Sequence, residues 1–159
     1  MLNKLLTLIL FFLPALALSA QTAAEMDTLL QAEAVSVAVA ARFILGSADL
    51  LPSGVSGSAA ERAAYDMAKS NGWVRKEAAD NITLKDTAFL VMRAFDFNGG
   101  VLYRIFRNPR YAYREMQYRK IIQGRAYSNM TVSGNRLLHI VGRAMSYSEE
   151  ISSAARETQ

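Results

Sequence analysis

Apolar residues recur at helical spacing in several separate stretches of this chain. Small and aliphatic side chains dominate residues 26–45, which predicts one long, largely buried helix. Turn-forming residues crowd residues 51–58 and predict a loop. Helix is expected to resume near Ala59 and to end at Gly72, because glycine readily adopts the left-handed conformation found after helices. A polar loop then extends to Asn81.

The clearest amphipathic pattern follows this loop. Thr83 stands where an N-cap is expected, and Asp86 lies three residues later, as in a capping box. One apolar face is marked at helical spacing by Leu84, Ala88, Val91, Met92 and Phe95. Residues 98–100 end this helix, and an aromatic and basic linker is expected at residues 101–109.

Two further helices are expected in the C-terminal third. Residues 111–122 form the first, and Ser133 caps the second, whose apolar positions lie within residues 137–145. The polar tail, residues 148–159, is predicted to be a frayed helix or disordered. The sequence therefore predicts an all-α fold, a compact helical bundle.

The N-terminus has the three-part layout of a cleavable secretory signal peptide. Lys4 precedes a run of apolar residues from 5 to 13, and Pro14 and small residues follow, up to Ala20. We expect cleavage after Ala20, a helical domain over residues 21–147, and a periplasmic or secreted protein. The apolar run is short for a membrane span, and no later stretch is long enough. The absence of cysteine excludes disulfides and a cysteine-linked lipid anchor.

Two segments of the chain resemble each other. A helix with Ala64-Tyr65, a Gly and a polar loop lead to Asn81-Ile82-Thr83, and the same order recurs from Ala112-Tyr113 through Gly124 to Asn129-Met130-Thr131. Each unit is a helix, a loop and a helix, and residues 26–45 can supply the last helix of a first unit. Such repetition favours a scaffold or binding surface over an enzyme.

These units resemble S-layer homology (SLH) repeats. The resemblance rests on residues 64–73 followed by 82–94, with a poorer copy at residues 118–144. It implies a pseudo-threefold arrangement of three helix-loop-helix repeats that binds an anionic wall polysaccharide. The family's signature arginine is absent, since Leu84 and Val132 stand at its positions. Residues 109–114 are also similar, more loosely, to small exported spirochaete envelope proteins.

Charge is distributed unevenly along the chain. The formal net charge is +4, but residues 101–159 carry ten Lys or Arg against four Asp or Glu, whereas residues 21–100 carry seven against ten. A basic surface favours anionic partners. An exported protein meets wall polymers, lipid headgroups and acidic proteins before it meets nucleic acid, so nucleic acid is not expected as a partner.

The densest candidate site is the basic, aromatic stretch that begins in the linker. Arginine forks can hold carboxylates or phosphates, and tyrosine faces can stack on sugars or on a partner's side chains. The predicted ligand-binding residues are Arg104, Arg107, Arg110, Tyr111, Tyr113, Arg114, Tyr118 and Arg119, together with Trp73 and Lys85. The alternative is that the aromatic rings pack on the core while the arginines pair with the acidic first half of the chain.

Nothing in the sequence indicates catalysis. His139 is the only histidine and lies among apolar residues, so we expect it to be structural and partly buried. No metal-ligand cluster, cofactor motif or paired carboxylate is visible, and no cofactor or metal is expected. The sequence predicts a non-catalytic binding or scaffolding module of the cell envelope that contacts an anionic wall polymer. The alternatives are an adaptor that docks on an acidic envelope protein and, third, a wall hydrolase.

Overall fold

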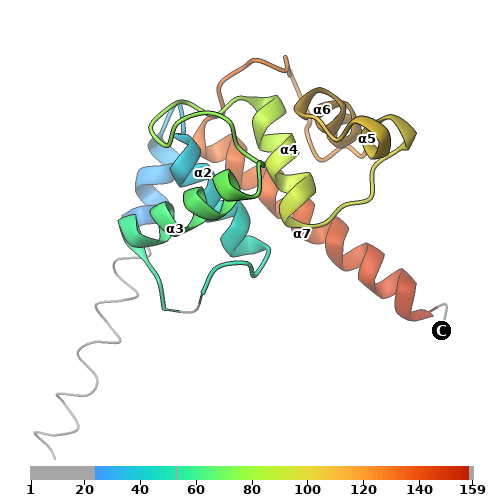
Figure 1. The fold of residues 1–159 in the computed structure, drawn as a ribbon, viewed down its shortest axis with the longest axis horizontal. Coiled ribbons are helices and arrows are strands. Elements are labelled where there is room, and N and C mark those ends of the chain that lie inside the picture. Colours follow the sequence, from blue (N-terminus) through green and yellow to red (C-terminus); the bar gives the residue numbers. More distant parts are fainter. Residues whose placement is uncertain (1–23, 53, 158–159) are drawn as a thin grey trace, which may run out of the picture.

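The computed structural model describes residues 24–52 and 54–157, which form helices joined by irregular segments (Figure 1). A first helix covers residues 24–31, and the others are α2 (Val37–Ser47), α3 (Gly57–Ser70), α4 (Leu84–Ala94), α5 (Val101–Phe106), α6 (Pro109–Tyr118) and α7 (Gly134–Glu157). The described part contains isolated β-bridges but no strand, which confirms the all-α class. The predicted signal peptide and its cleavage site lie outside the described residues.

The single helix predicted over residues 26–45 is wrong, because the chain breaks at residues 32–36. Val35 turns both of its peptide groups to other parts of the chain: its N–H donates to Val132 and its carbonyl accepts from Ile82, each at 2.9 Å. Ser36 then caps α2, accepting from the Val39 N–H at 3.4 Å. Apolar spacing continues through this break, so periodicity alone does not show it.

Three buried segments are joined by a closed ring of backbone hydrogen bonds. Val35 donates to Val132, Val132 donates to Ile82 at 3.2 Å, and Ile82 donates back to Val35. All three side chains are buried. The ring residues are followed directly by Ser36, Thr83 and Ser133, which precede α2, α4 and α7. We call α2, α4 and α7 the inner helices.

A second set of bonds repeats around this ring. The residue two positions after each ring residue donates its N–H to the neighbouring segment; the pairs are Val37 to Asp80, Leu84 to Met130 and Gly134 to Ala32, at 2.8 to 2.9 Å. Val132, rather than Met130, thus takes the position that corresponds to Ile82. The sequence alignment of residues 81–83 with residues 129–131 is therefore two residues out of register.

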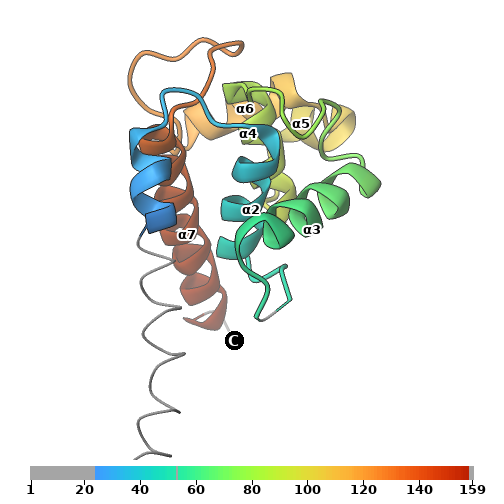
Figure 2. The ribbon, with the colours of Figure 1, turned by 90° about the vertical axis from the view of Figure 1, so that its left-hand side faces the viewer.

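The outer helices pack in the same cyclic order. The inner helices contact one another at the centre, α3 packs on α2, and α6 packs on α4. The helix of residues 24–31 lies beside the first half of α7 (Figure 2). Its Leu29 carbonyl oxygen lies so close to Gly134 that a Cβ there would overlap it. Thus α3 and α6 pack on the inner helix of the preceding unit, whereas the helix of residues 24–31 contacts α7 through Leu29 and α2 through the Glu25–Arg42 ion pair.

Backbone groups from a neighbouring segment take over part of the predicted capping at α4. Thr83 is the N-cap residue, as predicted, but its hydroxyl donates to the Asp86 carboxylate at 2.6 Å instead of capping a backbone N–H. The first amides of α4, Leu84 and Lys85, donate to the carbonyls of Met130 and Ser128. At α7, the Ser133 hydroxyl does accept from the Arg136 N–H, at 3.4 Å.

Two segments are more helical than the sequence indicates. The linker over residues 101–109 contains α5, and the described part of the polar tail continues α7 to Glu157. The last turns of α7 are exposed and project beyond the other helices (Figure 1). Within the described ranges, no helix combines the length and hydropathy that a membrane crossing requires.

The close approach at Gly134 predicts opposite effects for two Gly→Ala changes in α7. Gly134→Ala forces a methyl group into the Leu29 carbonyl and should destabilise the fold by about 1–3 kcal/mol. Gly142→Ala meets no atom within 4 Å and should stabilise it by about 0.5–1 kcal/mol through helix propensity. Urea unfolding of both variants checks this pair, and equal effects would contradict the packing of residues 24–31 on α7.

Candidate binding surface

Local sequence explains why α5 and α6 form a short corner at one side of the molecule (Figure 1). Gly99 precedes α5, and a Cβ there would overlap the Tyr103 ring. The chain leaves α5 at Arg107, which has a positive φ of 37°. Asn108 then caps α6 by accepting from the N–H groups of Arg110 and Tyr111, at 3.1 and 3.2 Å, with Pro109 in the first turn.

The outward face of α5 is apolar. Four large side chains are exposed on it: Val101 by 70%, Leu102 by 48%, Ile105 by 66% and Phe106 by 55%. Tyr103, on the opposite face, is buried, and burial raises its pKa while the guanidinium groups of Arg93 and Arg107 oppose that rise. Such a group of adjacent exposed aliphatic and aromatic side chains is typical of interaction sites.

Exposed arginines lie on α5, in the turn after it and on α6. Arg104, Arg107, Arg110 and Arg114 are exposed, and none of them is within salt-bridge distance of a carboxylate in the described part of the chain. Tyr118 is 85% exposed, and Tyr111 stacks on Phe106 with ring centroids 5.3 Å apart. We call these side chains, with the four apolar ones, the α5–α6 surface.

An open groove lies between the two helices of this surface. It is lined by Gly100, Val101, Leu102, Tyr103, Tyr111, Arg114, Glu115 and Tyr118. Glu115 is already engaged, because it accepts from the Gly100 N–H at 3.1 Å and pairs with Arg119 at 2.7 Å. The available chemistry in the groove is therefore cationic and aromatic.

Two predicted binding residues instead hold the fold together. Tyr113 is buried, and its hydroxyl donates to the Ala126 carbonyl at 2.8 Å. Arg119 pairs with Glu115, donates to the Asn98 carbonyl and the Tyr147 hydroxyl, and places its guanidinium 4.9 Å from the centre of the Tyr147 ring. Arg119 thereby ties the end of α6 to α7.

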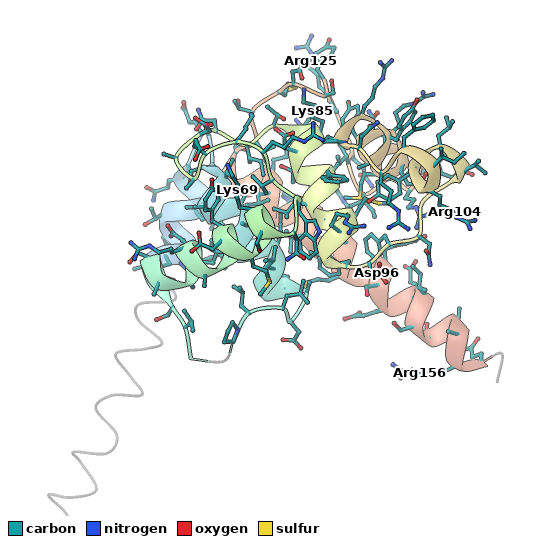
Figure 3. All side chains as sticks on the ribbon, in the orientation of Figure 1. Lys69, Lys85, Asp96, Arg104, Arg125 and Arg156 are labelled. Atoms are coloured by element: carbon teal, nitrogen blue, oxygen red, sulfur yellow. The ribbon has the colours of Figure 1, made fainter. Side chains whose placement is uncertain are left out.

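The remaining two predicted residues are not part of the α5–α6 surface. Trp73 is half-buried, and the Arg93 guanidinium lies 5.8 Å from the centre of the Trp73 ring. Phe89 and Pro109 line the same pocket as Trp73. Lys85 is half-buried in the first turn of α4, and Figure 3 shows it well apart from Arg104. The structure thus brings together Arg104, Arg107, Arg110, Tyr111, Arg114 and Tyr118.

His139 is exposed, so the expectation of a partly buried histidine is wrong. Its apolar neighbours Leu137 and Ile140 point to the core, whereas the histidine ring lines an open groove with Arg136 and Arg143. Within the described residues, no group of His, Asp and Glu side chains could hold a metal ion.

The comparisons with known proteins return nothing for this chain: no family model, curated protein or solved structure matches it. The resemblance to SLH repeats therefore stays a prediction.

The contacts of Arg119 predict a stability difference between two arginines of the α6 region. Arg119→Gln should lower the free energy of unfolding by about 2–4 kcal/mol, because Glu115 would lose its partner in a site where both side chains are about 15% exposed. Arg114→Gln, on the exposed face of α6, should change it by less than about 0.5 kcal/mol. Chemical denaturation of both variants measures this difference, and similar values for both would contradict the structural role of Arg119.

Proposed function

We propose that this chain is an exported, non-catalytic binding module of the bacterial cell envelope that docks its α5–α6 surface on an acidic protein partner. The signal-peptide pattern of residues 1–20 supports export and a periplasmic or secreted location. The absence of any recognisable catalytic motif in the sequence supports a binding role.

One observation carries this proposal: four exposed apolar side chains of α5 occur together with four exposed arginines of α5, α6 and the turn between them, none paired with a carboxylate in the described part of the chain. Apolar side chains gain free energy only when a partner removes them from water. A folded protein provides such a dry cover, whereas a hydrated polysaccharide does not cover Val101 and Ile105 well. The arginines add selectivity, because they favour a partner with carboxylates around its own apolar centre.

A second candidate function, binding of an anionic wall polymer, is favoured by the groove of the same surface. Tyr111 and Tyr118 offer ring faces on which sugars stack, and Arg114 between them offers a fork for a carboxylate or phosphate. This candidate uses the groove, which Val101 and Leu102 also line, and leaves Ile105 uncovered. The two candidates therefore make different demands on Ile105 and Tyr118.

We further propose that the fold consists of three SLH-like units. The ring of Val35, Ile82 and Val132 and the cyclic packing of the outer helices support three similar units around a common centre. The signature arginine is absent in both alignments of the units. The hydrogen-bond ring aligns Gly134 with Leu84 of the second unit, and the sequence comparison aligns Val132 with Leu84. Ligand binding by the family's usual arginine is therefore not part of the proposal.

Two variants of the α5–α6 surface separate the candidates. Ile105→Ser, at a position outside the groove lining, should weaken binding to a solubilised envelope-protein fraction by about tenfold, through lost apolar burial. It should leave binding to protein-free sacculi carrying their secondary polymers nearly unchanged. Arg107→Gln/Arg110→Gln/Arg114→Gln should weaken binding in both assays, more strongly at low salt.

A matched control removes three exposed arginines elsewhere, as Arg62→Gln/Arg75→Gln/Arg156→Gln. This control has the same net charge as the Arg107→Gln/Arg110→Gln/Arg114→Gln variant, and it should bind like the unchanged protein. Sedimentation and saturation titration measure binding of each variant to the envelope-protein fraction and to the sacculi. A protein partner should saturate at a fixed stoichiometry. Retention on sacculi that is sensitive to Tyr118→Ala but not to Ile105→Ser would favour the polymer. Binding that survives every one of these variants would rule out the α5–α6 surface.

A further inference from the structure

A groove borders each inner helix, and in two of the three the lining includes a carboxylate that pairs with a neighbouring cation. Beside α2, Arg42 pairs with Glu25 and lies 3.8 Å from Glu61. Beside α4, Lys76 pairs with Asp86 at 3.3 Å. Beside α7 the lining contains cations and no carboxylate, which sets this third groove apart.

The third groove, which we call the α7 groove, is cationic. Its lining consists of Gln123, Gly124, Ser133, Asn135, Arg136, His139 and Arg143, with no carboxylate among them. Arg136 donates one bond to the Gln123 carbonyl at 3.2 Å, and Arg143 donates one to the Ile121 carbonyl at 3.3 Å. A guanidinium has five N–H groups, so both arginines keep further donors.

The carbonyl bonds also fix the two arginines in place. Both residues are half-buried, and these bonds place their guanidinium groups beside the segment that precedes α7. Residues 136, 139 and 143 follow helical spacing and share one face of α7. The His139 ring, which can donate an N–H in either tautomer, therefore lies between the two arginines along the helix.

We propose that the α7 groove binds a phosphate-class oxyanion, held by Arg136, His139 and Arg143. A tetrahedral oxyanion offers oxygens in several directions and suits donors that are placed along a helix, whereas a carboxylate offers only two coplanar oxygens. Preformed arginine donors strengthen such binding because their conformational entropy is already lost. The site is independent of the α5–α6 surface and shares no residue with it.

Because His139 is the only histidine in the chain, its ring signals in an NMR spectrum report on this groove without ambiguity. The test titrates the purified protein with inorganic phosphate and, separately, with glycerol phosphate, with chloride keeping the ionic strength constant. Saturable shifts of the His139 ring and of the Gly124 amide are expected in both titrations. Vesicles containing phosphatidylglycerol form a third arm, which shows whether a lipid-borne phosphate enters the groove as well.

The variants separate specific binding from a general charge effect. Arg136→Gln/Arg143→Gln should lose about tenfold or more in phosphate affinity. Arg62→Gln/Arg156→Gln removes the same charge from two exposed positions outside both surfaces and should bind phosphate as before. Shifts that fail to saturate in the unchanged protein would overturn the proposal, and so would equal losses in the two variants or a response to vesicles alone. None of these outcomes depends on the α5–α6 surface having a partner.

Discussion

The structure depends on one constraint, which is that peptide groups taken out of water must find partners. Val35, Ile82 and Val132 are buried, and each exposes an N–H and a carbonyl to the centre of the fold. An unpaired buried peptide group costs about 1–3 kcal/mol, so three unpaired segments would cost a large part of a domain's net stability. The closed ring pairs all six groups and fixes where the inner helices begin.

Most helices could be predicted from the sequence because their signals are local. The apolar face of α4, the cap at Ser133 and the helix end near Gly72 depend on residues that are close together in the chain. The break before α2 and the two-residue register shift at Val132 depend on the ring, whose members come from distant segments. Single-sequence patterns carry no information on such pairings.

The candidate site was predictable in part, for a similar reason. The basic, aromatic composition marked the segment that forms α5 and α6, but the sequence did not show how the loop would place Arg107 and Arg110. Tyr113 and Arg119 have the same side-chain types as the exposed residues but make internal contacts. The exposed apolar face of α5 was not predicted, because α5 has only six residues, too few to show a helical period. The exposure of His139 did have a signal: it lies out of phase with the buried series of Leu137, Ile140, Val141 and Ala144.

The cyclic packing also determines when the chain can complete its fold. The helix of residues 24–31 contacts α7 at Gly134, more than a hundred residues later, so this contact is among the most non-local in the molecule. Non-local closure is slow, because much chain entropy must be lost before the contact forms. During synthesis, the first segment therefore stays without its docking site until α7 has emerged. For a chain that we propose is exported, this delay would keep it in the unfolded state that passage through a translocation channel requires.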